Sequence, residues 1–257
     1  MASRIPSIFV SHGAPTLVFE DIAARHFMAG LGAQLPRPEA ILCISAHWET
    51  KEPTVSATPQ PKTIHVFYGF PDALYRLRYA APGAPELALR VTELITSNGQ
   101  RCLVDHDRGL DHGAWNPLTL IYPDADIPVA QLSIQSSLDP AHHVALGRAL
   151  RPLRDEGVLL LASGGAVHNL QQFRVDPQTA APWAVSFDDW LADRITAGDE
   201  EDLIAYRETR PEARLAHPRD EHFMPLFVAL GAGGGKGRPL HRSFAHGSLS
   251  MAAFAWE

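Results

Sequence analysis

Short, continuous runs of apolar residues alternate with segments of helical periodicity along most of the chain. The runs predict interior strands, because strands covered on both faces need no polar alternation. They occupy residues 5–10, 40–46, 101–104, 129–134 and 158–162. Apolar residues spaced three and four apart predict helices between them. These helices cover residues 21–35, 85–97, 140–154 and 184–197. The alternation is typical of an α/β fold with a central, largely parallel sheet and helices on both faces.

Some stretches depart from this alternation. Residues 52–82 are rich in Pro and aromatic side chains, so we expect a functional loop or lid there rather than long helices. Residues 224–230 predict a short apolar helix, and residues 231–237 a glycine-rich turn that lacks the placement of a dinucleotide or phosphate loop. Residues 249–256 predict a closing strand. We expect one domain over residues 1–257, because no repeat or interdomain linker is evident.

Composition narrows the class of partner. Apolar residues make up 46% of the chain and charged residues 20%, as in ordinary globular proteins. The net charge of -7 and the lack of a Lys/Arg cluster disfavour nucleic acid, and no apolar run approaches the roughly 18 residues of a membrane span. Cys43 and Cys102 lack CxxC spacing, which disfavours disulfides and thiolate zinc sites and favours a reducing cytoplasm. A small-molecule partner is therefore expected.

Four histidines stand in short segments that look suited to holding them still: His12, His47, His168 and His222. The first three follow predicted strands, whose carboxyl ends share one edge in an open α/β sheet. Small neighbours such as Gly13 and Ala46 let the backbone pass close to a bound ion. Any single histidine is more often structural than functional, but several imidazoles at one edge predict a metal site.

His112 has a different setting. It lies in the segment 109–115 (GLDHGAW), which puts a carboxylate, an imidazole and an aromatic ring in one loop. We expect a helix to start just after it, at Asn116 and Pro117. His112 is therefore a candidate acid/base group. The other histidines are expected to be bystanders: His26, His65, His106, His142, His143, His217, His241 and His246.

Five segments together resemble the class III extradiol ring-cleavage dioxygenases, and within that superfamily the 4,5-DOPA extradiol dioxygenase group. They are residues 9–15 (FVSHGAP), 44–49 (ISAHWE), 67–71 (FYGFP), 109–115 (GLDHGAW) and 163–170 (SGGAVHNL). The resemblance runs in the same order over most of the chain. It implies a single-domain α/β fold, in agreement with the strand pattern, and an oxidoreductase that opens a catechol ring with O2.

The resemblance also implies one divalent metal ion. His12, His47 and His222 look like its ligands, where other branches of the superfamily supply a glutamate in the third position. With three histidines as ligands, the identity of the ion stays open: it could be Fe(II) for activity or Zn(II) as the bound ion. His168 resembles an active-site acid/base and could also be a fourth ligand, and His112 resembles the second acid/base.

Several alternatives stay open from the residues themselves. Glu49 and Glu221 are near the expected ligands and could orient an imidazole or, less often, bind the ion directly. Phe67, Tyr68 and Trp115 could line the substrate slot or pack in the core. Zinc has no redox chemistry, so a zinc-dependent hydrolase on the same fold is the first alternative function. A non-enzymatic binding protein is the second, because fold does not fix function.

Overall fold

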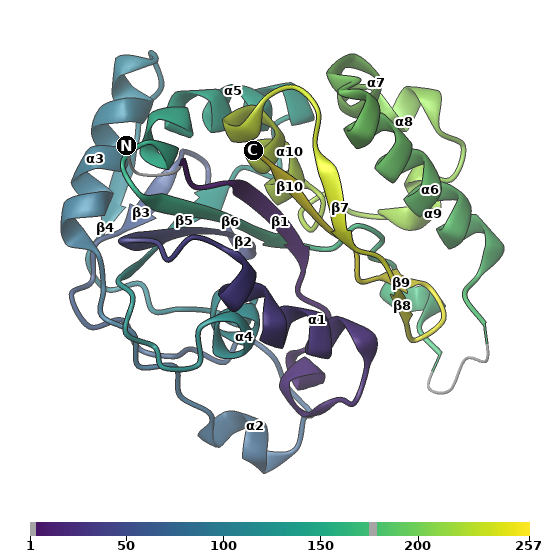
Figure 1. The fold of residues 1–257 in the computed structure, drawn as a ribbon, viewed down its shortest axis with the longest axis horizontal. Coiled ribbons are helices and arrows are strands. Elements are labelled where there is room, and N and C mark those ends of the chain that lie inside the picture. Colours follow the sequence, from purple (N-terminus) through teal and green to yellow (C-terminus); the bar gives the residue numbers. More distant parts are fainter. Residues whose placement is uncertain (1–3, 175–178) are drawn as a thin grey trace.

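The computed structural model describes residues 4–174 and 179–257, and Figure 1 shows a central sheet with helices on both faces. The expected fold class is confirmed: a single α/β domain with a largely parallel sheet. The strand order is β4-β3-β5-β2-β6-β1-β10-β7. The strands of this sheet are β1 Ser7–Ser11, β2 Ala40–Glu49, β3 Thr54–Ser56, β4 Leu103–Asp105, β5 Val129–Ile134, β6 Val158–Gly164, β7 Arg238–His241 and β10 Ala253–Trp256. A hairpin of β8 (Phe244–Ala245) and β9 (Leu249–Ser250) lies outside it.

The parallel centre of the sheet brings distant residues to one edge. Strand β6 pairs in parallel with β1 on one side and β2 on the other, with Ser11 opposite Gly164 and Ser45 opposite Ser163. The carboxyl ends of all three strands therefore meet, as the sequence predicts. Strands β10 and β7 extend the sheet in antiparallel pairing beyond β1. The closing strand predicted over residues 249–256 is thus present as two short strands, β9 and β10, of which β10 joins the sheet, whereas β7 was not predicted.

Alternate side chains of the buried strands pack against helices on opposite faces. Phe9 and Leu160 belong to the core cluster shared with α3, α5, α6 and α10, whereas Ile8 and Leu161 belong to the cluster shared with α1 and α4. The helices are α1 Ala23–Leu31, α2 Asp72–Arg76, α3 Pro85–Ser97, α4 His112–Ile121, α5 Pro140–Leu150, α6 Pro182–Ala197, α7 Glu200–Ile204, α8 Tyr206–Thr209, α9 Ala213–Ala216 and α10 Met224–Gly233. Figure 1 shows α3 and α5 on one side of the sheet and α1 and α4 on the other.

Several predicted boundaries need correction. Helix α4 begins at His112, not at Asn116, because the Asp111 side chain caps it by accepting from the Gly113 N–H. Pro117 therefore lies inside the helix. Helix α10 continues to Gly233, so the turn expected from residue 231 begins later. Between residues 52 and 82 the structure has only the short elements β3 and α2, in agreement with the expected loop.

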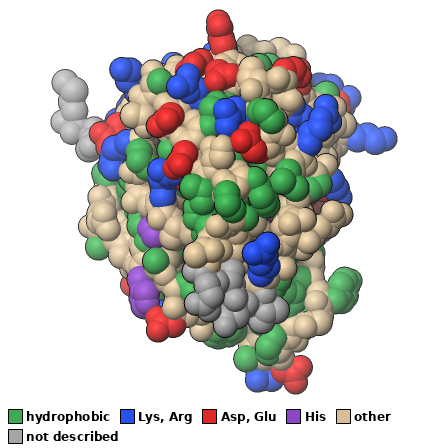
Figure 2. All heavy atoms as spheres, turned by 90° about the vertical axis from the view of Figure 1, so that its right-hand side faces the viewer, with side chains coloured by type: hydrophobic (Ala, Val, Ile, Leu, Met, Phe, Trp, Pro, Cys, Tyr) green, Lys and Arg blue, Asp and Glu red, His purple; other side chains and the backbone are tan. Residues whose placement is uncertain are grey.

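No helix in the described part of the chain is both long and apolar enough to cross a membrane. Figure 2 turns the molecule so that the right-hand side of Figure 1 faces the viewer. Acidic and basic side chains are mixed with apolar ones over the part of that face that the structure describes.

Candidate active site

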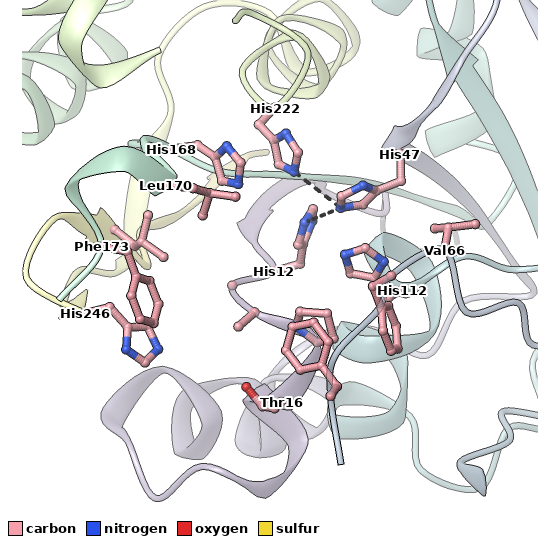
Figure 3. A pocket seen from close by; sticks show the side chains of 16 residues that line it. His12, Thr16, His47, Val66, His112, His168, Leu170, Phe173, His222 and His246 are labelled. Carbon is pink, nitrogen blue, oxygen red and sulfur yellow. Dashed lines mark hydrogen bonds between the residues drawn. The ribbon is translucent and has the colours of Figure 1, made fainter. Parts of the chain in front are cut away.

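Three imidazoles converge at the carboxyl edge of the sheet. His12 follows β1, His47 lies near the end of β2, and His222 precedes α10. The Nε2 atom of His47 is 2.9 Å from that of His12 and 3.3 Å from that of His222. One ligand atom from each residue lies within 4.8 Å of the others, and Figure 3 shows the three rings facing one another. The sequence-predicted ligands His12, His47 and His222 are therefore brought together.

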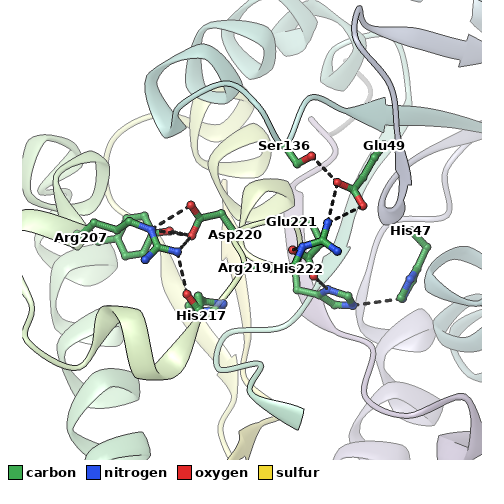
Figure 4. Close-up of polar contacts among 10 residues, drawn as sticks. His47, Glu49, Ser136, Arg207, His217, Arg219, Asp220, Glu221 and His222 are labelled. Carbon is green, nitrogen blue, oxygen red and sulfur yellow. Dashed lines mark hydrogen bonds and ion pairs between the residues drawn. The ribbon is translucent and has the colours of Figure 1, made fainter. Parts of the chain in front are cut away.

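Hydrogen bonds on the far side of two rings determine which nitrogen faces the centre. The Ser163 hydroxyl donates to the carbonyl oxygen of Gly113, so its oxygen accepts from Nδ1–H of His12 at 2.9 Å. His222 Nδ1 likewise donates to Glu221 Oε1 at 3.1 Å. An imidazole protonated at Nδ1 presents a lone pair at Nε2. Glu221 thus contacts the His222 ring and fixes its orientation, whereas Glu49 bonds Ser136 and Arg219 instead (Figure 4).

The close approach of β6 to His222 depends on glycine. The Gly165 N–H donates to the carbonyl oxygen of His222 at 2.8 Å. A Cβ atom at Gly164 would overlap with that same oxygen. These contacts hold His222, which lies far along the chain from β1 and β2, at the carboxyl edge of the sheet.

This donor set fits a divalent cation. Burial, followed by the neighbouring imidazoles, holds the pKa of His12 and His222 well below 6.5, so both rings are neutral. Of the three rings, only His47 remains to donate a proton from its Nε2 atom. One N–H group cannot bond the Nε2 lone pairs of both His12 and His222 equally well. A metal ion accepts all three nitrogen lone pairs, and imidazole suits zinc, copper, iron and nickel.

His112 and His168 flank the three rings on different sides. The His112 ring centroid is 3.8 Å from that of His47, and its Nδ1 is buried with no hydrogen-bond partner among the described residues. The His168 ring stacks parallel on His222 at 3.6 Å. Its ligand atom groups with Glu221 and His222 rather than with the other two imidazoles. Burial lowers the pKa of His112 to about 3 and that of His168 to about 4.

A buried carboxylate holds the His112 loop against the sheet. Asp111 Oδ1 accepts from Ser45 Oγ at 2.6 Å and from the Gly113 N–H at 3.0 Å. Its Oδ2 accepts from Arg108 Nη2 at 2.8 Å and Gln131 Nε2 at 2.6 Å. Ser45 is two residues before the predicted ligand His47, so this one carboxylate links strand β2 to the start of α4.

The five histidines open into a largely apolar cavity of about 380 Å³. Phe67 lines the cavity, as one of the two alternatives for these aromatic residues predicts. Tyr68 is instead 92% exposed, and Trp115 is fully buried in the core. His246, expected to be a bystander, also lines the cavity and stacks on Phe173 at 4.3 Å. Its position at a positive φ in the turn after β8 brings it there, and no local sequence signal indicated this.

Comparisons with known proteins agree with this geometry. Residues 6–255 match the family described as the catalytic LigB subunit of aromatic ring-opening dioxygenase. The chain is 45% identical over 254 residues to a 4,5-DOPA dioxygenase extradiol of Beta vulgaris, covering 96% of this chain and 95% of the relative. It is 42% identical over 258 residues to the protein of the same name from Escherichia coli K12, covering 97% and 94%. The crystal structure of an uncharacterized protein from Escherichia coli K12 is similar with a TM-score of 0.84 and 36% identity, covering 99% of this chain and 100% of that one.

Proposed function

Because the chain belongs to the family of the catalytic LigB subunit of aromatic ring-opening dioxygenase, we propose that it opens the ring of a DOPA-like catechol beside its two hydroxyls. Family membership confirms the resemblance that the five sequence segments predict. Both atoms of O2 would enter the product as one ring carbon–carbon bond breaks. The observation that carries the proposal is the convergence of three Nε2 atoms beside two further neutral imidazoles in an apolar cavity.

His12, His47 and His222 would hold the divalent ion, for which we propose Fe(II) in the active enzyme. When bound, Fe(II) would supply the one-electron chemistry that lets O2 react with the ring, which zinc cannot supply. Three neutral imidazoles contribute no negative charge, so the site would favour a ligand that brings its own. A catechol that has lost a proton is such a ligand.

His112 and His168 would accept and return the protons. Both are neutral near pH 7 because burial lowers their pKa values, so each has a free lone pair to accept with. The unpartnered Nδ1 of His112 leaves that ring without a competing hydrogen bond on that side. The apolar cavity wall, which includes Phe67 and Phe70, would pack against the ring and exclude water.

Reconstitution of metal-free protein under anaerobic conditions tests the proposal. We expect oxygen uptake with DOPA, and with other catechols, after loading with Fe(II) and none after loading with Zn(II). Ester or amide hydrolysis with zinc and no uptake with iron would instead support the zinc-dependent hydrolase. A protein that takes up neither metal would support a non-enzymatic binding protein.

The place of the protein in the cell is part of the same proposal. Cys43 is buried and Cys102 is half-buried, and both are free thiols. Free thiols are compatible with the reducing cytoplasm that the sequence predicts.

A further inference from the structure

The cavity has a second polar region, on the side away from His47 and His112. Besides the five histidines of the candidate site, only Thr16 and His246 contribute polar side chains to the part of the wall that the structure describes. Figure 3 shows both residues across the cavity from His47. The described lining contains no lysine, arginine, aspartate or glutamate. A ligand held at the five histidines therefore meets polar side chains at its other end at Thr16 and His246.

One carboxylate, that of Glu20, contacts both of these residues. The Thr16 hydroxyl donates to Glu20 Oε1, and His246 Nε2 is 3.6 Å from Glu20 Oε2. That distance is too long for a hydrogen bond between the imidazole and the carboxylate. The Glu20 side chain is 21% exposed, and no lysine or arginine in the described part of the chain forms an ion pair with it. No fixed positive charge there therefore balances Glu20.

The turn after β8 holds the His246 ring in one place. His246 has a φ of 51°, and Gly247 continues the turn at a φ of 82°. Two successive positive φ values usually belong to an Asn-Gly pair, so a histidine is a less common choice here. The His246 carbonyl oxygen accepts from the Arg174 N–H at 2.9 Å, and the ring stacks on Phe173 at 4.3 Å. The backbone of this turn does not require an imidazole, yet the cavity wall receives one in a fixed position.

The three side chains together offer hydrogen-bond acceptors. Glu20 Oε2 accepts, as does an unprotonated nitrogen of His246, and the Thr16 oxygen keeps a lone pair while its proton bonds Glu20. An ammonium group has three N–H donors and a positive charge. It can donate to two acceptors that lie 3.6 Å apart, and it offsets the charge of the carboxylate. A carboxylate group in the same place would be repelled by Glu20.

We propose that Glu20, Thr16 and His246 bind the ammonium group of an aminoalkyl chain on the catechol ring. The substrate class is then catechols that carry an amine, and a chain that ends in a carboxylate is disfavoured. An amine without a carboxylate should be a better substrate than DOPA, because the described lining has no lysine or arginine to bind the carboxylate of DOPA. This preference rests on the proposed function, because it concerns which catechol is cleaved; the binding of an ammonium group does not.

Two substitutions change this subsite while keeping its backbone. Glu20→Gln removes the charge but keeps an oxygen that accepts from Thr16. His246→Asn removes the imidazole and puts a residue that tolerates a positive φ in its place. Glu212→Gln is the matched control. The Glu212 carboxylate also accepts from a hydroxyl, that of Ser186, and its side chain is 22% exposed, but it does not belong to the cavity lining.

Oxygen-uptake kinetics of the Fe(II)-loaded protein compare catechols that differ in the end of the chain: dopamine, ethylcatechol and dihydroxyphenylpropionate. For the unaltered protein and Glu212→Gln, we expect kcat/KM to be roughly tenfold higher for dopamine than for dihydroxyphenylpropionate. Glu20→Gln should lower kcat/KM for dopamine roughly tenfold, and His246→Asn should lower it less. The loss should appear mainly in KM, because the chain does not change charge in the reaction.

Ethylcatechol is the internal control of the same assay. Its kcat/KM should change less than about twofold in both variants, because it has no charged group to lose a contact, and this retained activity shows that the variants are folded. Equal losses for dopamine and ethylcatechol, or a preference of the unaltered protein for dihydroxyphenylpropionate, would overturn the proposal.

Binding to the metal-free protein separates the subsite from the reaction. Phenethylamine carries the ring and the ammonium group but no hydroxyls, so it probes the subsite without metal or O2. Isothermal titration calorimetry should show tighter binding of phenethylamine than of phenylpropionate, and Glu20→Gln should weaken the binding of phenethylamine roughly tenfold. Equal affinity for the two compounds, or no effect of Glu20→Gln, would contradict the subsite. If the iron-loaded protein cleaves no catechol at all, the proposed function fails, yet this titration still decides whether the subsite exists.

Discussion

Replacing Asp111 by Asn tests whether one buried carboxylate holds the candidate site together. The side chain is fully buried and accepts four hydrogen bonds, two at each oxygen. Its ionic partner Arg108 is only 18% exposed and also stacks over Trp48 at 5.0 Å. Asn has nearly the same shape, so the substitution removes the charge and one acceptor while leaving the packing almost unchanged.

The expected loss of stability follows from these contacts. Removing one partner of a buried ion pair typically costs about 3–5 kcal/mol, because the other charge stays buried without compensation. The Asn amide must also point its NH2 group at two donors, either Ser45 and the Gly113 N–H or Arg108 and Gln131. These terms overlap, so we expect a total loss of about 3–5 kcal/mol in the free energy of unfolding.

Urea denaturation of the metal-free protein at pH 7 measures this loss. The control is Glu93→Gln, which breaks the ion pair of Arg90 with Glu93, whose side chain is 64% exposed. The control should lose no more than about 1 kcal/mol. A loss below about 1 kcal/mol for Asp111→Asn would refute the reasoning, because the carboxylate would then contribute no more than a surface charge.

Four further outcomes follow from the site and its surroundings. His222→Ala should abolish binding of the metal ion proposed at His12, His47 and His222, whereas His168→Ala should retain that ion and lower kcat about 10²- to 10⁴-fold; metal analysis with oxygen-uptake kinetics separates the two. Gly164→Ala should destabilise the fold and weaken metal binding, because its Cβ overlaps with the carbonyl oxygen of His222; unchanged affinity by metal titration would contradict this. Burial lowers the pKa of His143 to about 4 and that of His217 to about 3, so the unfolded chain takes up protons below pH 6.5 that the folded chain does not. Each of these two histidines should therefore lower the free energy of unfolding by about 1.4 kcal/mol per pH unit, from pH 6.5 down to its pKa in the folded protein. A free energy of unfolding from urea denaturation that stays constant between pH 6.5 and 5 would argue against this.

Part of the site could be predicted from local sequence because strand ends determine it. His12 and His47 come at the ends of apolar runs, and the shared carboxyl edge of parallel strands predicts that they meet. His222 follows no predicted strand; its segment made it a candidate, but only the resemblance of the chain to a family placed it with His12 and His47 in one ligand set. Its place depends on the close approach of β6 across Gly164 and Gly165, a contact between segments more than fifty residues apart.

Other residues were missed for a similar reason. His246 reaches the cavity from the turn between β8 and β9, and nothing near it in the sequence distinguishes it from a surface histidine. The start of α4 was misplaced because Asn116 and Pro117 carry an ordinary helix-start signal. Asp111, a good capping residue, competes with that signal and prevails because its side chain is also bonded to Ser45 and Gln131. Tertiary contacts thus selected between two local signals.

Pro117, which lies inside α4 rather than at its start, also affects the candidate metal centre. Inside an α-helix the N–H of residue 117 would donate to the carbonyl oxygen of Gly113, but Pro117 has no N–H. That oxygen is therefore available to the Ser163 hydroxyl, which must then accept rather than donate at His12 Nδ1. His12 is protonated at Nδ1 as a result and presents its lone pair at Nε2. The helix defect thus selects the tautomer that a metal ligand requires, through contacts among four residues from three different segments of the chain.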